Sequence, residues 1–340
     1  MAPSIFFLFC TWIVCLILLP TSFVDSLCRP DESFSLMEFK QSFRIDRTEW
    51  LCDYPKVESW SLDGHGDCCS WDGVKCDEAT GHVTGLDLNG SCLVDAQLSG
   101  PIPSSLGNLT RLVRLYLSSN NLQGEIPNSL WELKDLEILD LSGNNLSGTV
   151  DLHRLENLEE LYLDFNNISF VSGIEMNTML SKLFYLSLES CNLQEFPKIL
   201  GHLRGLERIY LSHNKIGGRI PTWMGNGSRE SLWYVDLSHN ILTSFVDNRI
   251  NILLPNLTYL DISSNLLKTE LPTPPPSVSY YNISNNILFG DIQSICGAKS
   301  LVTLDLSSNS LNGTIPSCLK NIHSLEILDL GKNKLDGSIP

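Results

Sequence analysis

The sequence predicts an α/β repeat solenoid, curved as a horseshoe whose inner, concave face is a parallel β-sheet. The first observation is a pattern, LxxLxLxxNxLxGxIP, that is written in full at Leu301–Pro316. In its LxxLxL part, alternate residues of a strand point to opposite faces, so the leucines fill a core that neighbouring coils close. The second observation is recurrence at about 24 residues, a spacing typical of one-strand-per-repeat solenoids. Eleven repeats are present, and they begin at Val83, Leu112, Leu136, Leu158, Leu183, Leu206, Leu232, Leu257, Val278, Leu301 and Leu325.

The ninth position of each repeat is the next regular feature. It holds asparagine in nine of the eleven repeats, and the exceptions are Ser91 and Cys191. A side-chain amide there can bond the backbone of the turn that leaves the strand, in its own coil and in the next. Because buried backbone groups need partners, we expect these asparagines to be structural.

The end of the pattern, LxGxIP, indicates a subtype. It stands at Leu98–Pro103, Leu122–Pro127, Ile216–Pro221, Leu311–Pro316 and Leu335–Pro340. It resembles the plant-specific class of leucine-rich repeats, and the resemblance covers nearly all of the chain after the first thirty residues. The resemblance implies a second short strand in this segment and a twist of the solenoid.

The N-terminal end predicts export. Residues 5–19 are an apolar run followed by Pro20, which is short for a membrane span and fits the core of a signal peptide. We therefore assign residues 1–26 to a signal peptide and begin the mature chain at Leu27. The run is preceded by no Lys or Arg, so a retained anchor is the alternative reading.

Residues 27–80 differ in composition from the repeats, which occupy residues 81–340. Apolar residues at helical spacing, from Phe34 to Phe43, follow Asp31 and Ser33, and predict a helix. A cysteine-rich stretch, Asp67–Cys76, comes next. The segment resembles the disulfide-bonded N-terminal cap of plant leucine-rich repeat proteins, and the resemblance implies the pairs Cys28–Cys68 and Cys69–Cys76.

Nine of the eleven cysteines follow the predicted leader, which favours an oxidising compartment. Cys92 follows the first turn and is a candidate partner for Cys52. Cys296 and Cys318 occupy nearly equivalent places on adjacent coils, so we expect a bridge between them. Cys191 is then left as a buried free thiol. Zinc held by Cys68, Cys69 and Cys76 is the alternative, but these cysteines lack CxxC spacing, and no metal site is predicted.

Eight N-x-S/T sequons are candidate glycosylation sites in an exported chain. They begin at Asn89, Asn108, Asn145, Asn167, Asn226, Asn256, Asn282 and Asn312. Asn282 falls at the fifth position of its repeat, on the predicted concave face, where a glycan would close that coil to a ligand.

Composition and motifs exclude several functions. The chain has 39 acidic and 23 basic residues and a net charge of −16, which argues against nucleic acid as a partner. No nucleophile elbow, metalloprotease motif, phosphate-binding loop or kinase signature occurs. We therefore predict that the protein is not an enzyme and has no cofactor.

The concave face carries the functional prediction. Positions three and five of successive repeats form continuous rows that point away from the core, and both rows are rich in tyrosine. Exposed Tyr and Arg resemble binding hot spots, so we expect a ligand patch over repeats four to nine. The candidate residues are Arg114, Tyr116, Glu160, Tyr162, Asp164, Phe165, Tyr185, Glu189, Arg208, Tyr210, Tyr234, Tyr259 and Tyr280.

The Pro-rich stretch Leu271–Asn286, with the cysteine motifs near 296 and 318, is similar to plant receptor-like proteins of immune or developmental type. That resemblance implies an extracellular recognition module that binds a peptide, a protein or an oligosaccharide and signals through a partner receptor kinase. The chain ends at Pro340 inside the eleventh repeat without a C-terminal cap, so we expect a part of a longer plasma-membrane protein or a truncated, secreted product. The alternative is a secreted inhibitor of extracellular enzymes, similar to polygalacturonase inhibitors.

Overall fold

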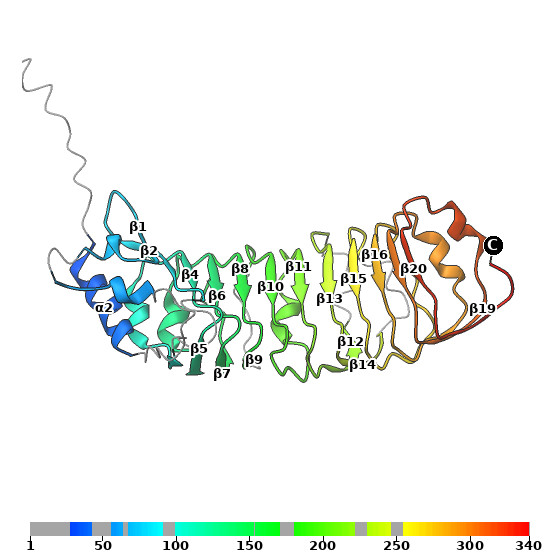
Figure 1. Cartoon of the computed structure of the whole chain (residues 1–340), viewed down its shortest axis with the longest axis horizontal. Helices are drawn as coiled ribbons and strands as arrows, with labels where there is room; N and C mark the ends of the chain where they lie inside the picture. The colour runs from blue at the N-terminus through cyan, green and yellow to red at the C-terminus, as the bar shows by residue number, and fades with distance from the viewer. Residues whose placement is uncertain are drawn as a thin grey trace, which may run out of the picture.

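The computed structural model describes residues 28–42, 56–63, 67–90, 99–152, 154–170, 180–221, 230–245 and 254–339. The predicted signal peptide, Cys52 and Cys92 lie outside these residues. Within the described ranges, no helix combines the length and apolar character needed to cross a membrane. The repeats follow one another along the long axis of the molecule, and their strands stand side by side across it (Figure 1).

The long sheet confirms the predicted solenoid. It has 12 strands, of which one belongs to the cap and the others follow sequence order, one from each repeat. Neighbours are parallel and in register, except that β1 pairs with β2 in the antiparallel sense. The strands are β1 (Val74–Cys76), β2 (Val83–Asp87), β4 (Arg114–Tyr116), β6 (Ile138–Asp140), β8 (Glu160–Tyr162), β10 (Tyr185–Ser187), β11 (Arg208–Tyr210), β13 (Tyr234–Asp236), β15 (Tyr259–Asp261), β16 (Tyr280–Asn282), β18 (Thr303–Asp305) and β20 (Ile327–Asp329).

The core consists of the leucines that the repeat pattern places inward. Leu139 and Leu141, at the fourth and sixth positions of their repeat, are fully buried, as are their counterparts in most repeats. One fourth position holds the fully buried Tyr281 instead. Its hydroxyl donates a 3.1 Å hydrogen bond to the carbonyl of Pro272, so the Pro-rich stretch supplies the partner that a buried phenol requires.

The ninth-position asparagines form the expected structural ladder. Asn240 donates from Nδ2 to the carbonyls of Leu237 and Ser238 in its own repeat and to Leu211 in the repeat before. Its Oδ1 accepts the N–H of Ile216, also in the repeat before. The inter-coil bonds thus run to the preceding repeat rather than to the following one. The backbone N–H groups of the same turn bond in the other direction, for example from His239 to the carbonyl of Ser263 in the following repeat.

The segments at the LxGx position of the repeats form the second short strands that the plant-type resemblance implied. These strands are β3 (Ser99–Gly100), β5 (Asn121–Glu125), β7 (Asn145–Val150), β9 (Asn167–Phe170), β12 (Gly217–Ile220), β14 (Ile241–Phe245), β17 (Phe289–Gly290), β19 (Ser310–Thr314) and β21 (Lys334–Asp336). The glycine of the motif has a positive φ, for example +81° at Gly124 and +79° at Gly313, a conformation that a side chain would strain. Among the described residues, this second sheet is interrupted after β9, at Asn192–Pro197, and after β14, at Leu266–Leu271. Glycine is not required for a second strand, because β9 and β14 contain none.

Short 3-10 helices connect the second strands to the next long-sheet strand and cover the opposite side of the core. They are η3 (Ser104–Asn108), η4 (Asn128–Glu132), η5 (Lys198–Gly201), η8 (Gln293–Gly297) and η9 (Ser317–Asn321). Cys296 of η8 and Cys318 of η9 form the disulfide expected between adjacent coils. Cys191 is a buried free cysteine, whose thiol donates to the carbonyl of Leu163.

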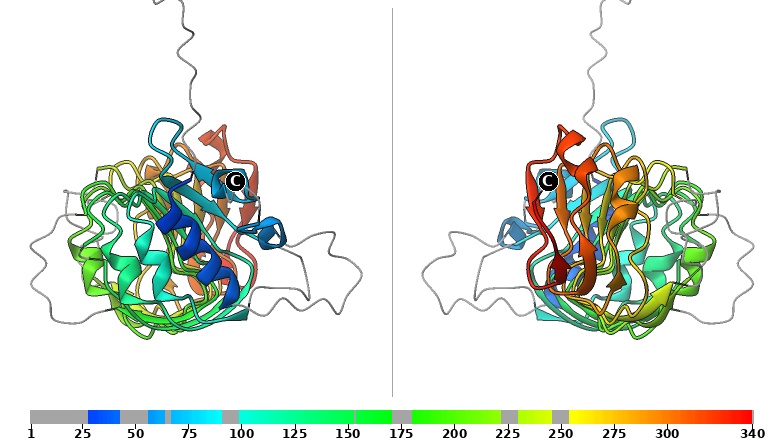
Figure 2. Two further views of the ribbon diagram at one scale, coloured as in Figure 1. Left: turned by 90° about the vertical axis from the view of Figure 1, so that its left-hand side faces the viewer. Right: turned by 90° about the vertical axis from the view of Figure 1, so that its right-hand side faces the viewer.

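The cap covers the first coil with α2 (Pro30–Gln41) and two 3-10 helices, η1 (Lys56–Ser59) and η2 (Cys68–Ser70). Figure 2, left, shows α2 across that end of the molecule. The helix begins at Pro30, before the expected start, and it buries Leu36 and Phe39. Phe34, expected on the apolar face, is exposed because it lies on the opposite side of the helix. Both bridges implied for the cap, Cys28–Cys68 and Cys69–Cys76, are present.

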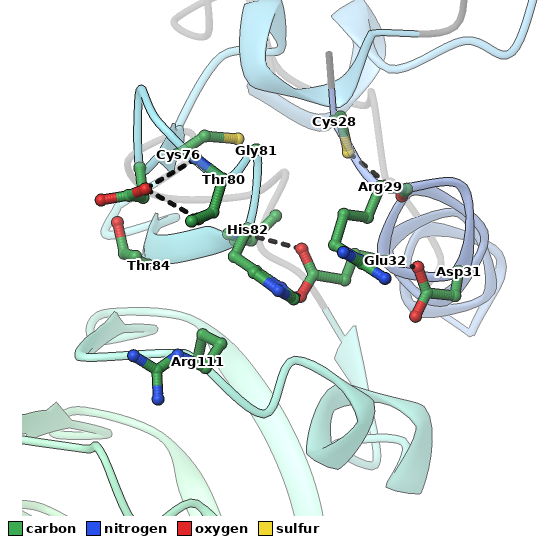
Figure 3. A network of polar contacts seen from close by, with 12 residues as sticks. Cys28, Arg29, Asp31, Glu32, Cys76, Thr80, Gly81, His82, Thr84 and Arg111 are labelled. Carbon is green, nitrogen blue, oxygen red and sulfur yellow. Dashed lines mark hydrogen bonds and ion pairs between the residues drawn. The ribbon is translucent and has the colours of Figure 1, made fainter. Parts of the chain in front are cut away.

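A buried carboxylate joins the cap to the first repeat. Glu32 of α2 points toward His82 (Figure 3), and its Oε1 lies 2.8 Å from His82 Nδ1. Its Oε2 accepts the N–H of Val83, the first residue of β2, at 2.7 Å. Glu32 is 2% exposed, so the carboxylate fixes the helix against the strand at a place that water does not reach.

Candidate ligand-binding surface

The outward-facing residues of the long sheet form the two predicted rows. Parallel pairing sets Tyr234 beside Tyr259 and Tyr259 beside Tyr280 at the third position. The same pairing sets Asp236 beside Asp261 and Asp261 beside Asn282 at the fifth position. The rows therefore come from in-register strands, and no loop conformation is needed to build them.

Six tyrosines of these rows are in contact from ring to ring, and we call them the tyrosine ladder. The ring centroids of successive members are 4.0–5.3 Å apart. Its N-terminal half alternates between the fifth and third positions, whereas its C-terminal half follows the third position alone. The members in order are Tyr162, Tyr185, Tyr210, Tyr234, Tyr259 and Tyr280.

The rings of the C-terminal half stack face to face. Tyr259 lies 4.0 Å from Tyr234 at an interplanar angle of 7°, and 4.2 Å from Tyr280 at 4°. Both faces of Tyr259 are thus covered by neighbouring rings. Burial raises the pKa of the phenols of Tyr234, Tyr259 and Tyr280, so their hydroxyls stay protonated at physiological pH.

An arginine and a tryptophan flank the middle of the ladder. The guanidinium of Arg208 lies 4.6 Å from the ring centroid of Trp233 and 5.9 Å from that of Tyr185. Trp233 also meets Tyr234 edge-on, with centroids 5.9 Å apart. Sequence reasoning did not select Trp233, because it stands at the second position of its repeat, before the strand begins. The signal that could have identified Trp233 is that a large aromatic residue lies close to two selected residues, Arg208 and Tyr234.

Carboxylates accompany the ladder along the fifth position. The Oδ1 atoms of Asp236, Asp261 and Asp305 each accept the backbone N–H two residues further on, at 2.9 Å, which caps the end of the strand. Asn282 performs the same role with its amide oxygen, at 3.1 Å. Burial raises the pKa of Asp236, and the carboxylates of Asp261 and Glu189 raise it further.

Asp164 and Glu189 lie at the seventh position beside the N-terminal half of the ladder. The Oδ1 of Asp164 accepts a hydrogen bond from Ser187 Oγ at 2.5 Å and from the N–H of Glu189 at 2.7 Å. Burial raises the pKa of Asp164, and the hydrogen bonds only partly oppose this shift. Asp164 therefore ties two repeats together in addition to facing the rows.

Family models for leucine-rich repeats match residues 97–146, 153–216, 256–278 and 300–322, and a model for the leucine-rich repeat N-terminal domain matches residues 29–77. Receptor-like protein 7 of Arabidopsis thaliana is 43% identical over 145 residues, which are 42% of this chain and 15% of that protein. The chain belongs to the plant leucine-rich repeat receptor-like proteins. It spans a small part of this relative's length.

Two solved structures resemble this receptor-like protein over most of the chain. The structure of PEPR1–AtPEP1 is 29% identical, with a TM-score of 0.77, over 92% of this chain and 43% of that one. The structure of the Arabidopsis receptor kinase HAESA, in complex with the peptide hormone IDA and the co-receptor SERK1, is 25% identical, with a TM-score of 0.59. The match to HAESA covers 92% of this chain and 59% of that one.

The remaining residues selected in this receptor-like protein lie at the margins of the ladder. Arg114 and Tyr116 belong to β4 and are separated from Tyr162 by the intervening strand β6. Glu160 accepts a hydrogen bond from the hydroxyl of Tyr162. The structure thus brings Glu160 to the ladder and leaves Arg114 and Tyr116 two strands away.

Phe165 has a backbone conformation that the sequence did not reveal. It stands at the eighth position, where the chain turns with positive φ in repeat after repeat, and its φ is +55°. A bulky side chain rarely adopts this conformation. Phe165 is 55% exposed. His213 and His239 occupy the same position further along and stack with ring centroids 4.2 Å apart.

The sequons fall mostly away from the ladder. Asn145, Asn167 and Asn312 are exposed on second strands, whereas Asn282 lies in the long sheet and donates from Nδ2 to Asp261 at 3.0 Å. Of the others, Asn108 and Asn256 are exposed, Asn89 is half-buried, and Asn226 lies outside the described residues. Glycans on the three second-strand sequons would leave the long sheet open.

Proposed function

We propose that this chain is the non-enzymatic recognition part of an extracellular, cell-surface receptor-like protein, and that the tyrosine ladder binds its ligand. The observation that carries the proposal is the ladder itself. Six half-buried tyrosines lie outside the leucine core, on the outward-facing side of the long sheet. Amphipathic tyrosines of this kind are typical energetic centres of protein interfaces.

The relatives support the class of ligand and partner. One solved structure that shares this fold is that of the receptor kinase HAESA in complex with the peptide hormone IDA and the co-receptor SERK1. A peptide or a protein segment is therefore the ligand that we propose, and a receptor kinase is the partner that would carry the signal. The relatives' names include the class of receptor-like protein, and the immune or developmental role that we propose rests on the sequence resemblance alone.

The proposal is tested by selecting ligands from a displayed library of random dodecapeptides on the purified chain. We expect binders of micromolar affinity or better. Tyr234→Ala combined with Tyr259→Ala should weaken them about 100-fold, because two central contacts of this type contribute about 1.4 kcal/mol or more each.

Two further variants separate binding from folding. Tyr234→Phe with Tyr259→Phe keeps the stacked rings and removes the hydroxyls, so it should weaken binding while the melting temperature stays near that of the wild type. Phe289→Ala removes an exposed aromatic ring from a second strand and should leave the affinity unchanged. A library that yields no binders, or binders that are indifferent to the double alanine variant, would overturn the proposal.

A further inference from the structure

We infer that the C-terminal half of the tyrosine ladder receives an extended, cationic peptide segment, and this inference rests on the proposed function. The surface concerned comprises Tyr234, Tyr259 and Tyr280 with the neighbouring Asp236 and Asp261. The orientation of the rings, the sign of the charge and the length of the ladder each restrict what can occupy it.

The orientation of the rings argues against an oligosaccharide. Sugars pack their C–H surfaces against the exposed face of an aromatic ring. Here the faces of Tyr259 are covered by Tyr234 and Tyr280, at nearly parallel angles of 7° and 4°. The ligand therefore meets ring edges and hydroxyl groups, which hydrogen-bond to the amides and carbonyls of a peptide backbone.

The sign of the charge selects a cation. At the third, fifth and seventh positions of repeats seven to ten, the charged residues are Asp236, Asp261 and Asp305, and no Lys or Arg is present. Asp261 is 7% exposed and receives bonds from Tyr280 and Asn282 through Oδ2, so a hydroxyl and an amide are its partners there. Arg208 lies one repeat before this surface and stacks on Trp233.

The ionised carboxylate of Asp236 destabilises the folded state. Its pKa is raised by burial and by other carboxylates, which means that its ionised form is less stable in the folded protein than in the unfolded chain. Asn282 shows that an uncharged amide can cap the same strand end. The carboxylate at 236 is therefore not required for capping, and a ligand cation would relieve the repulsion between Asp236 and Asp261.

The length of the ladder fits a short extended segment. Successive centroids are separated by five steps of 4.0–5.3 Å. At about 3.3 Å per residue, an extended peptide of about seven residues covers this distance. The open surface above β13, β15 and β16 takes the cationic part of such a segment.

The test uses the dodecapeptides selected on the full chain. We expect the selected sequences to be enriched in Lys and Arg at least twofold over the unselected library. Raising NaCl from 0.05 to 0.5 M should weaken the strongest binder about tenfold, since salt screens the attraction between the Lys and Arg side chains of the peptide and this acidic surface. Asp236→Asn with Asp261→Asn should weaken this binder at least tenfold. Lys215→Gln removes an exposed charge directly after the ninth-position asparagine of repeat six, and it should leave the affinity unchanged.

The outcomes separate the two proposals. Peptides that bind, depend on Tyr234 and Tyr259, and yet lack Lys and Arg enrichment or salt dependence would overturn the cationic segment while the recognition surface stands. If Asp236→Asn with Asp261→Asn lowers the affinity of the peptides, but Tyr234→Ala with Tyr259→Ala does not, the cation binds away from the tyrosine ladder. This result would overturn the inference as well. Failure to select any peptide removes the recognition function and the inference with it.

Discussion

Replacing one of the ninth-position asparagines should destabilise the solenoid by several kcal/mol. Asn240 is 6% exposed and makes four hydrogen bonds of 2.9–3.1 Å, three as donor and one as acceptor. Asn240→Ala leaves the Ile216 N–H and the carbonyls that Asn240 bonds without this partner in a place closed to water. At about 1–3 kcal/mol for each buried group that loses its partner, the expected loss is roughly 3–6 kcal/mol.

The measurement is urea unfolding followed by tryptophan fluorescence, to which Trp233 in the same repeat contributes. Because repeats contact mainly their neighbours, hydrogen exchange should show the loss concentrated in repeats six and seven. Asn240→Asp, which keeps the acceptor but buries a charge and loses the donors, should be at least as destabilising. Lys215→Ala, an exposed neighbour, serves as the control. A loss in the free energy of unfolding below about 1 kcal/mol for Asn240→Ala would refute the structural role of the ninth-position asparagines.

Three further predictions concern single side chains. Glu32→Ala should lower the stability of the cap by about 1–3 kcal/mol, measured by thermal unfolding, because the N–H of Val83 loses its buried acceptor. An unchanged melting temperature would contradict the role of Glu32 in joining the cap to the first repeat. Burial raises the pKa of the Cys191 thiol to about 12, so iodoacetamide at pH 8 should label it only in denaturant, and rapid labelling of the folded chain would disprove its burial. The folded-state pKa of Asp236 is raised, so its charge opposes folding above that pKa and not below the unfolded value. Asp236→Asn should therefore raise the melting temperature at pH 7 and lose this advantage near pH 3, whereas a loss of stability at pH 7 would contradict the assignment.

Much of the fold was predictable because it repeats. The inward leucines, the asparagine ladder and the second strands each depend on local chemistry that recurs at fixed positions, and the structure has them where the pattern placed them. The pairing of Cys296 with Cys318 followed from the same equivalence between coils. The predicted direction of the inter-coil bonds made by side chains such as Asn240 was wrong, because the repeat pattern does not specify toward which of its two neighbouring coils the amide points.

The candidate site was predictable only in part. The frame identified which tyrosines face outward, but the stacking angle between Tyr234 and Tyr259 depends on side-chain rotamers that no repeat pattern specifies. Trp233 was missed because it precedes the strand. The burial of Glu32 was missed because the cap does not repeat, and its contact with His82 joins residues far apart in the sequence.

The most direct test of the recognition surface is fluorine NMR of the chain labelled with 3-fluorotyrosine, with the nine tyrosine resonances assigned by single Tyr→Phe variants. Adding the strongest selected dodecapeptide should shift the resonances of Tyr234, Tyr259 and Tyr280 and leave the buried Tyr281 unchanged. Shifts confined to tyrosines outside the ladder, such as Tyr116, with unchanged ladder resonances at saturating peptide, would contradict the account.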